Sequence, residues 1–517
     1  METVSVVRLR APLPSPGASV TLAVCVLLCL GGGSPALASP SLASPALASP
    51  VPPVSDPSAS AVGVAAHGDR RVVTEPAAPA TTCATVPARV AVSARRASDA
   101  DEADAPDGPR IQAALDACAG KGGAVRLQAS GASASFLSGP LSVRAGEVLL
   151  VEPGAVLYAS RDATDYQVAG RPRCGTIGGA GDGCRPLITL SSHSGIASSG
   201  APGTVRGRID GRGDMPILSG TVSWWQLAAS AKEGGKQNVP RLVVATRADD
   251  VTLHDVDLVS SPGTHVSFDH GLGLTVWGVV IRTPAGARNT DGINPAGATD
   301  VTVAHSWISA GDDGIAIKAG SAPSAHISIV QDHLFGTHGI SIGSETAAGV
   351  SDVLVADDTV SGRDAFGTLS VAAGGIRIKS AGGVGGLVRD VEYRDVCVDQ
   401  VKYPMLFDSS YGEASVGSAP HFQDIVVDGF RATASLHLAS SSLEGYDAAH
   451  PLGLELRRTA VDAAPVGAAF ADITTAGATF GGVPLASTRP DVRITAGPAV
   501  GSPPACTSPA FPAVGGR

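Results

Sequence analysis

The sequence predicts an all-β fold, a single-stranded parallel β-helix whose coils stack on one another, with one short helix capping its N-terminal end. Of its 517 residues, 64 are Gly, 37 are Pro and only 16% are charged, a composition that supplies many turns and excludes a helical bundle. A short strand motif also recurs at an even interval without helical patterns between its copies. A β-sandwich is the alternative, but it does not require so even a period.

Residues 1–38 are typical of a secretory signal peptide. Arg8 and Arg10 precede an apolar run over residues 20–30, and small residues follow at 36–38. That run is shorter than the roughly 20 residues that a membrane-spanning helix needs. We therefore expect a secreted, extracellular protein without a permanent membrane anchor.

The exported chain is expected to have three parts. Residues 39–82 are rich in Pro, Ala and Ser, which predicts a linker that packs no core. The β-helix is expected over residues 83–495, and a Pro/Gly-rich tail over 496–517. The capping helix is predicted over Pro109–Cys118, where apolar residues share one face and Gly120 follows as a stop.

The repeated motif is an Asp followed by alternating apolar residues, as in Asp300-Val301-Thr302-Val303. With two weaker copies included, the intervals between strand starts are 23, 27, 26 and 26 residues, for starts at Val251, Leu274, Val301, Ile327 and Val353. One interval is one coil. Residues one period apart should therefore be neighbours at about 4.8 Å, the spacing between strands.

Six of the eight cysteines lie beyond the predicted signal peptide and reach an oxidising compartment. Their proximity in sequence favours two disulfides, Cys83 with Cys118 and Cys174 with Cys184. Cys397 lies in an apolar strand, where a buried thiol is the simplest interpretation, and Cys506 lies in the tail. The pairing of these last two is left open.

The charge of the chain limits its partners. A formal net charge of −10 argues against nucleic acid and against attachment to anionic lipid by charge alone. An acidic polysaccharide would need a local basic patch. Arg377 and Lys379 supply one, because residues two apart on a strand project to the same side.

Polar insertions on successive coils bring three acids and a histidine to one face. The spacing from Asp291 to Asp312 is 21 residues, and that from Asp312 to His338 is 26, close to one coil in each case. Asp313 follows Asp312 directly. Each motif alone is typical of a turn, but their common period is much less expected by chance.

Such clustered carboxylates, without a metal-ligand pattern, suggest glycoside hydrolysis. In this reaction one carboxylic acid protonates the leaving oxygen and another carboxylate activates water. Like charges one coil apart cannot all ionise easily, so one pKa in the cluster should rise.

With further motifs, the chain resembles the polygalacturonases of glycoside hydrolase family 28, particularly the secreted bacterial group. The resemblance covers roughly residues 83–495. Its main motifs are Asn289-Thr290-Asp291-Gly292, Gly311-Asp312-Asp313, the run from His338 to Glu345, and Arg377-Ile378-Lys379-Ser380. Further matches lie at residues 136–141, 209–213, 222–225 and 237–242.

The resemblance implies a right-handed β-helix and hydrolysis of α-1,4 bonds in homogalacturonan with inversion, without cofactor or metal ion. The enzyme is expected to be a monomer acting on polygalacturonate or pectin. By the same resemblance, Asp312 is the general acid, Asp291 and Asp313 position and deprotonate water, and His338 tunes the proton of the acid. The implied substrate-binding residues are Asn289, Arg377, Lys379 and Tyr411.

Two residues depart from the family pattern, since the family usually has Gly where this chain has Thr337, and often Cys or Asn where it has Gly314. We expect Thr337 to narrow the cleft or shift His338, and Gly314 to loosen the turn that carries Asp313. Trp224 and Trp225 are interpreted as a buried anchor rather than a sugar-stacking platform.

Attack within the polysaccharide chain is expected, because the β region shows no large inserted domain that would close the groove. Insertions between Cys174 and Cys184, or in the loop at 381–386, could still close it. The alternatives are an exo-acting polygalacturonase, a rhamnogalacturonan hydrolase of the same family, a pectate lyase, or a noncatalytic pectin-binding β-helix.

Overall fold

The structure is a computed structural model that describes residues 67–200, 203–412, 415, 417–498 and 500–513. The predicted signal peptide and the first part of the predicted linker lie outside the described residues. Among the described residues, no helix is both long and apolar enough to cross a membrane.

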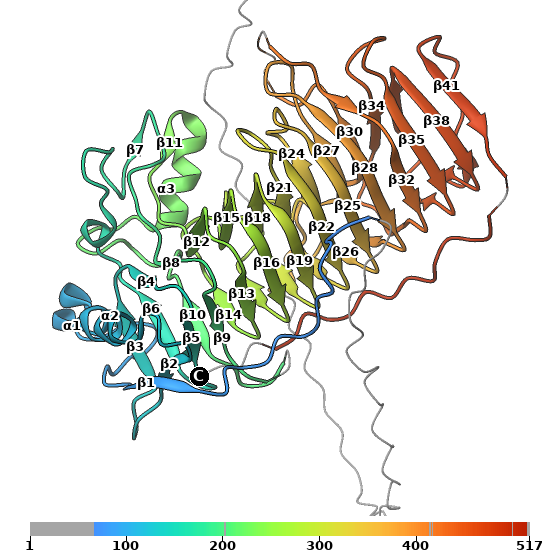
Figure 1. Ribbon diagram of the computed structural model, residues 1–517. Helices are drawn as coiled ribbons and strands as arrows, with labels where there is room; N and C mark the ends of the chain where they lie inside the picture. The colour runs from blue at the N-terminus through green and yellow to red at the C-terminus, as the bar shows by residue number, and fades with distance from the viewer. Residues whose placement is uncertain (1–66, 201–202, 413–414, 416, 499, 514–517) are drawn as a thin grey trace, which may run out of the picture. The chain divides into compact units, whose positions relative to one another are not determined.

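Three long, essentially parallel sheets run along the molecule, and the chain visits them in turn once per coil (Figure 1). The first sheet contains β1 (Thr82–Pro87), β2 (Ala124–Gln128), β5 (Val148–Val151), β9 (Gly195–Ala197), β13 (Val251–His254), β16 (Leu272–Trp277), β19 (Thr299–Ala304), β22 (Ser324–Val330), β25 (Val350–Ala356), β28 (Leu387–Arg394), β31 (His421–Phe422), β32 (Ile425–Asp428), β35 (Leu452–Arg457), β38 (Ala471–Ala476) and β41 (Val492–Ala496).

The second sheet contains β3 (Ser135–Ser138), β6 (Val156–Ala159), β10 (Arg208–Asp210), β14 (Asp257–Val259), β17 (Val280–Arg282), β20 (Trp307–Ser309), β23 (His333–Phe335), β26 (Thr359–Ser361), β29 (Cys397–Asp399), β33 (Arg431–Thr433), β36 (Ala460–Val461), β39 (Thr479–Phe480) and β40 (Val483–Pro484), the last of which is antiparallel to β39.

The third sheet, which carries the candidate site, contains β4 (Leu141–Val143), β8 (Ile188–Leu190), β12 (Val243–Thr246), β15 (Val266–Asp269), β18 (Ile293–Ala296), β21 (Ile315–Ile317), β24 (Ile340–Gly343), β27 (Gly374–Lys379), β30 (Tyr403–Asp408), β34 (Ser441–Glu444) and β37 (Val466–Ala469). A separate antiparallel pair is formed by β7 (Ile177–Gly178) and β11 (Lys236–Gln237).

The register confirms the predicted coil period. Val251 pairs with Leu274, Leu274 with Val301, Val301 with Ile327, and Ile327 with Val353. The fold is the predicted right-handed parallel β-helix. Asp residues that open several of these strands, such as Asp300 and Asp352, have positive φ angles, a conformation that Asp tolerates better than most residues.

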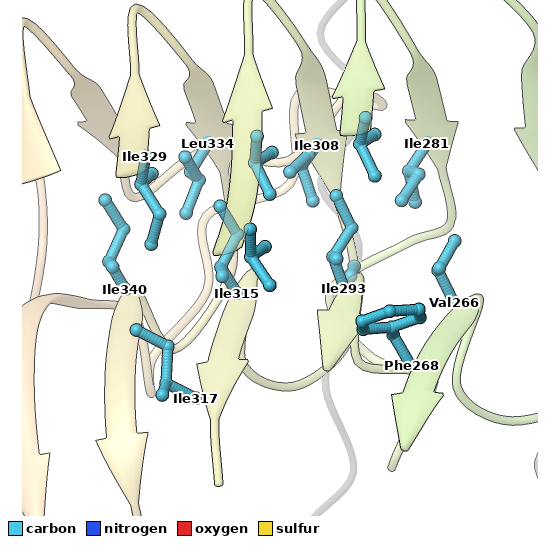
Figure 2. Packing of buried hydrophobic residues seen from close by; sticks show 14 of the residues in the cluster. Val266, Phe268, Ile281, Ile293, Ile308, Ile315, Ile317, Ile329, Leu334 and Ile340 are labelled. Atoms are coloured by element: carbon cyan, nitrogen blue, oxygen red, sulfur yellow. The ribbon is translucent and has the colours of Figure 1, made fainter. Parts of the chain in front are cut away.

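The core is a column of aliphatic side chains enclosed by the three sheets. Ile293, Ile315, Ile340 and Ile376 pair in register along the third sheet, and each is at most 1% exposed. Figure 2 shows residues of this row with Ile308 and other apolar side chains of the second sheet. The row fixes which face of every coil points inward, so polar residues at alternate positions are held outside.

Helix α2 (Asp107–Cys118) confirms the predicted cap. It begins two residues before Pro109, and buries Ile111, Leu115 and Cys118 against the first coils. The shorter helices are α1 (Asp99–Asp104), α3 (Trp224–Ser230) and the 3₁₀ turns η1 (Ala163–Tyr166) and η2 (Ala231–Glu233).

The predicted disulfides Cys83–Cys118 and Cys174–Cys184 are present, and the pair left open, Cys397–Cys506, is bonded. The last of these holds the C-terminal segment against β29. Further along the segment, Phe511 packs on Phe335 of β23, with the two ring centroids 5.1 Å apart. The predicted tail is thus attached to the second sheet over part of its length.

The linker prediction is wrong at its C-terminal end. Residues 67–81 already lie along the β-helix, where Asp69 is buried and its backbone N–H donates to Ser328 Oγ at 2.9 Å. Arg70 pairs with Asp300 across two hydrogen bonds. The Pro/Ala/Ser composition of the whole segment conceals this short run, which binds through ion pairs and through Val73, buried against Trp277 and Ala304.

Candidate active site

The four predicted catalytic residues lie on loops that lead from the second sheet to the third. Asp291 precedes β18, Asp312 and Asp313 precede β21, and His338 precedes β24. These loops are joined by backbone hydrogen bonds, from Gly292 N to the Asp313 carbonyl at 3.0 Å and from His338 N to the Asp312 carbonyl at 2.8 Å. Stacking of three consecutive coils thus brings the side chains together.

Asp312 is held by contacts on both carboxylate oxygens. His338 Nδ1 lies 3.0 Å from Oδ1, and Asn289 Nδ2 donates to Oδ2 at 3.0 Å. Gln237 Nε2 in turn donates to Asn289 Oδ1 at 3.0 Å. Asn289 has a φ of 59°, which its short amide side chain tolerates. In this structure Asn289 orients Asp312.

Opposing effects act on the Asp312 carboxyl. Burial alone would raise its pKa, but the hydrogen bond and positive charge of His338, together with the charge of Lys379, lower the pKa to about 2. The Asp312 carboxyl is therefore ionised in the free protein, with the His338 imidazole within hydrogen-bond distance.

The pKa of Asp291 is shifted in the opposite direction. Burial raises the pKa of Asp291 to about 6, and the negative charges of Asp312 and Asp313 add to this effect. Its Oδ2 accepts a hydrogen bond from Asn294 Nδ2 at 2.9 Å. The expected rise of one pKa in the cluster is confirmed, and it falls on Asp291.

Asp313 is the most fully paired carboxylate of the group. Its Oδ1 accepts from Ser341 Oγ at 2.8 Å and from Arg377 Nη1 at 3.2 Å, and its Oδ2 accepts from Lys379 Nζ at 2.8 Å. Arg377 and Lys379 are only 7% and 6% exposed. Their predicted contact with substrate carboxylates must therefore coexist with, or replace, this pairing with Asp313.

Tyr411 lies beside these two cations. Its ring centroid is 5.8 Å from the Arg377 guanidinium carbon and 5.2 Å from Lys379 Nζ, and the residue is 39% exposed. This arrangement suits a ring that covers the cations and still reaches a ligand. The substrate-binding role expected for Tyr411 stays a prediction.

A cavity of about 310 Å³ lies next to Asp291, over the strands on the N-terminal side of the acid cluster. Sequence reasoning missed several of its polar residues, which are Lys236, Gln237, Arg241, Asn294 and Lys318. Lys318 could have been found from the sequence, because Ile315 and Ile317 alternate with outward positions and Lys318 occupies the next one. It therefore projects outward beside Asp291.

Gly314 and Thr337, the two residues that depart from the family pattern, lie next to each other. A Cβ added to Gly314 would be 3.1 Å from Thr337 Oγ1 and 2.4 Å from Leu334 Cδ2. Thr337 is fully buried, and its Oγ1 accepts from the N–H of Gly339 at 3.1 Å. Thr337 thus fills the space that a side chain at position 314 would need, and it points into the turn rather than narrowing the cleft.

Trp224 is fully buried, as expected for an anchor. Trp225 is half-buried, and its Nε1 donates to the Ser261 carbonyl at 2.8 Å. Ser223 caps helix α3 by accepting from Gln226 N, and Gln226 reciprocates, which holds the two indoles in place.

Comparison with known proteins agrees with this geometry. A model of glycosyl hydrolases family 28 matches residues 180–476. An endo-polygalacturonase of Pectobacterium carotovorum subsp. carotovorum is 40% identical over 351 residues, which cover 67% of this chain and 82% of the relative. The chain belongs to glycosyl hydrolases family 28.

Another relative and a solved structure support the same family membership. A polygalacturonase of Ralstonia solanacearum is 32% identical over 461 residues, covering 79% of this chain and 85% of that protein. The solved structure of a polygalacturonase from Erwinia carotovora ssp. carotovora superposes with a TM-score of 0.66 at 34% identity, covering 82% of this chain and 99% of that one. This chain is therefore a glycoside hydrolase.

Proposed function

We propose that the protein hydrolyses α-1,4-galacturonosyl bonds of polygalacturonate, with inversion at the anomeric carbon. The observation that carries this proposal is the meeting of three carboxylates and a histidine on consecutive coils, beside cations that an otherwise acidic protein places there. The relatives named endo-polygalacturonase and polygalacturonase support the same substrate.

In this proposal Asp312 donates a proton to the leaving oxygen, while Asp291 and Asp313 hold and deprotonate the attacking water. His338 tunes the proton on Asp312. Asp313 is held in place by its contacts with Arg377 and Lys379, and Asn289 keeps Asp312 oriented.

The low pKa of Asp312 sets a condition on this reaction, because the carboxyl is ionised in the free protein and must carry a proton when the bond breaks. Substrate that excludes water from the cluster should raise the pKa of this carboxyl, because burial penalises its charged form. Substrate binding thus prepares the acid.

Cations on both sides of the acid cluster support binding of a polyanionic chain. Lys236, Arg241 and Lys318 line the cavity on the side of β12 to β21, and Arg377 and Lys379 lie on β27. Carboxylates of successive galacturonate units suit such positions, Arg by bidentate and Lys by point-charge contact. Binding on both sides of the scissile bond favours attack within the chain.

The predicted signal peptide and the three disulfides support action outside the cell, where pectin is found. The enzyme is proposed to act as a monomer, with the polysaccharide as its partner.

The direct test is turnover of polygalacturonate by Asp312→Asn. We expect at least a 1,000-fold loss of kcat with little loss of oligogalacturonide binding, because the leaving oxygen loses its proton donor. Asp472→Asn, which changes a carboxylate on a distant coil, is the matched control and should retain full activity.

The products separate the proposal from its alternatives. Proton NMR during the first turnovers should show inverted reducing ends. An unsaturated, ultraviolet-absorbing product would instead identify a lyase, and saturable binding without products would identify a noncatalytic pectin-binding protein. Turnover by Asp312→Asn above a few per cent of the wild-type kcat would contradict the assigned role.

A further inference from the structure

The segment at residues 67–81 leads along the outer face of the first sheet toward the N-terminal coils (Figure 1). Its first contacts are with β22 and β19, through Asp69 to Ser328 and to Thr302 Oγ1. Further on, Arg71 Nη2 donates to the Leu274 carbonyl of β16 at 2.8 Å. This path carries Glu75 to the end of β13.

At that point three potential metal ligands converge beside the first sheet, whereas the acid cluster lies on loops before strands of the third sheet. His254 Nε2 lies 3.7 Å from Glu75 Oε1 and 3.3 Å from Asp255 Oδ2. One ligand atom from each of the three residues lies within 4.8 Å of the other two. Glu75 comes from the N-terminal segment, whereas His254 and Asp255 come from the end of β13 and the turn after it.

The histidine itself indicates a ligand. The His254 side chain is only 8% exposed, and within the described part of the chain neither ring nitrogen has a hydrogen-bond partner. Buried polar groups are nearly always satisfied, so an unpaired imidazole facing two carboxylates calls for an explanation.

The surroundings hold the carboxylate in a suitable direction. Arg206 Nη1 lies 3.3 Å from Asp255 Oδ1, which leaves Oδ2 toward His254. Arg206 is itself fixed by Asp257, through two hydrogen bonds to Oδ1 at 3.0 and 2.7 Å. Ligating carboxylates are commonly oriented by hydrogen bonds of this kind.

The distances and the ligand types suit a small tetrahedral ion. Zn²⁺ binds imidazole nitrogen and carboxylate oxygen at about 2.0–2.2 Å in tetrahedral geometry, which places ligand atoms about 3.4 Å apart. The observed separations of 3.3 and 3.7 Å bracket this value. Ca²⁺ prefers six to eight oxygen ligands and does not suit an imidazole with two carboxylates.

We propose that Glu75, His254 and Asp255 bind one divalent transition-metal ion of the Zn²⁺ class, which fastens the N-terminal segment to β13. Because two ligands belong to the β-helix and one to the segment, binding should stabilise the attachment of the segment.

The test uses the full exported chain, stripped with a chelator and then titrated with ZnCl₂ in a calorimeter. We expect one site per chain and a rise in unfolding temperature with bound Zn²⁺. Co²⁺ in place of Zn²⁺ should give the visible absorption of a tetrahedral site. Glu75→Gln, at a half-exposed position that tolerates the change, should weaken binding at least tenfold, and His254→Gln should do the same.

Two variants control for other sites. His193→Gln removes an exposed histidine that pairs with Asp250 at 3.1 Å, and should leave binding unchanged. Asp312→Asn disrupts a second His-carboxylate group, Asp312, Asp313 and His338, whose members already pair with one another or with cations. Absence of Zn²⁺ binding, binding unaffected by Glu75→Gln, or binding lost only in Asp312→Asn would overturn the proposal.

Discussion

Arg377 and Lys379 both contact the Asp313 carboxylate, and this pairing changes what their removal should do. Residues that only bound substrate would affect affinity alone. Since Lys379 also holds Asp313, we expect Lys379→Met to lower kcat about 10- to 100-fold in addition to raising KM, the scale of one hydrogen bond to a charged group. Steady-state kinetics on polygalacturonate measures both constants.

Lys402→Met is the matched control for this change. Lys402 lies just before β30 and donates to backbone carbonyls of Leu438 and His437 rather than to a carboxylate of the acid cluster. Its removal should leave both constants close to those of the wild type. A Lys379→Met enzyme with altered KM and unchanged kcat would show that the Asp313 contact does not matter for the reaction.

The pKa of Asp291, raised to about 6, predicts the pH dependence. A carboxylate that deprotonates water must be ionised, and Asp291 is ionised only above its pKa. The value of kcat/KM should therefore fall as the pH drops below about 6. Lys318→Met removes a positive charge that lowers the pKa of Asp291. The fall of kcat/KM on the acidic side should therefore move to higher pH in this variant.

A pH profile with the opposite slope would reverse the roles assigned to Asp291 and Asp312. If kcat/KM instead fell as the pH rose through about 6, Asp291 would be the proton donor. Hydrolysis of an oligogalacturonide with a nitrophenyl leaving group provides a second readout, because loss of the general acid is tolerated when the leaving group needs no proton. We expect this substrate to restore the activity of Asp312→Asn more than the activity of Asp291→Asn.

The proximity of the three acids could be predicted from the sequence, because it depends only on the length of a coil. The apolar repeat determines that length. The partners of the cations were not predictable in the same way. Ser341 and Arg377 pair in register on adjacent strands, but which oxygen of Asp313 they reach depends on the path of the loop before β21. Spacing along the sequence carries no information about that path.

Among the structural elements, the turns that carry Asp313 and His338 are packed as a pair through Gly314 and Thr337. We expect Gly314→Asn to destabilise the fold by about 1–3 kcal/mol, because the new side chain overlaps Thr337 and Leu334. Adding Thr337→Gly should recover part of this loss. Chemical denaturation of the two single variants and the double variant measures the coupling.

Thr337→Gly alone serves as the control and should cost stability by leaving the space beside Gly314 unfilled. Strictly additive effects of the two substitutions would contradict the coupling. The departures were individually visible in the sequence, but their contact was not, because 23 residues separate them and only the coil period brings them together.

The strands were predicted well, and the connecting segments less well, for the same physical reason. Strand register is fixed by a repeated apolar row such as Ile293, Ile315 and Ile340, which many contacts determine together. The attachment of residues 67–81 depends instead on a few local contacts, which include the ion pair of Arg70 with Asp300 and the burial of Val73 against Trp277. Composition averaged over a long Pro/Ala/Ser-rich stretch does not reveal them.

Over the molecule as a whole, the described parts of the two terminal segments, residues 67–81 and 500–513, leave the third sheet uncovered. The N-terminal segment contacts the first sheet, and the C-terminal segment is tied to the second by Cys397–Cys506. The site therefore faces solvent on a long surface that other coils continue in both directions (Figure 1). An extended polymer suits such a surface better than a small molecule does.

The mode of attack follows from where the cations lie along this surface. Lys236 and Arg241 lie on one side of the acid cluster, and Arg377 and Lys379 on the other. Gly181, within the Cys174–Cys184 loop, also lines the cavity. This loop is the feature most able to close that end and to favour exo attack.

Because cations are present on both sides, we expect galacturonate units to bind on each side of the bond that breaks, so that cleavage occurs within the chain. A solution of polygalacturonate should then lose viscosity steeply while few reducing ends have formed, and early products should be mixed oligomers. Arg241→Ala should weaken cleavage of long oligomers more than that of short ones, since short substrates can bind without reaching this position. Monomer or dimer as the sole product from the first minutes would mean that the Cys174–Cys184 loop closes the groove and that the enzyme acts from a chain end.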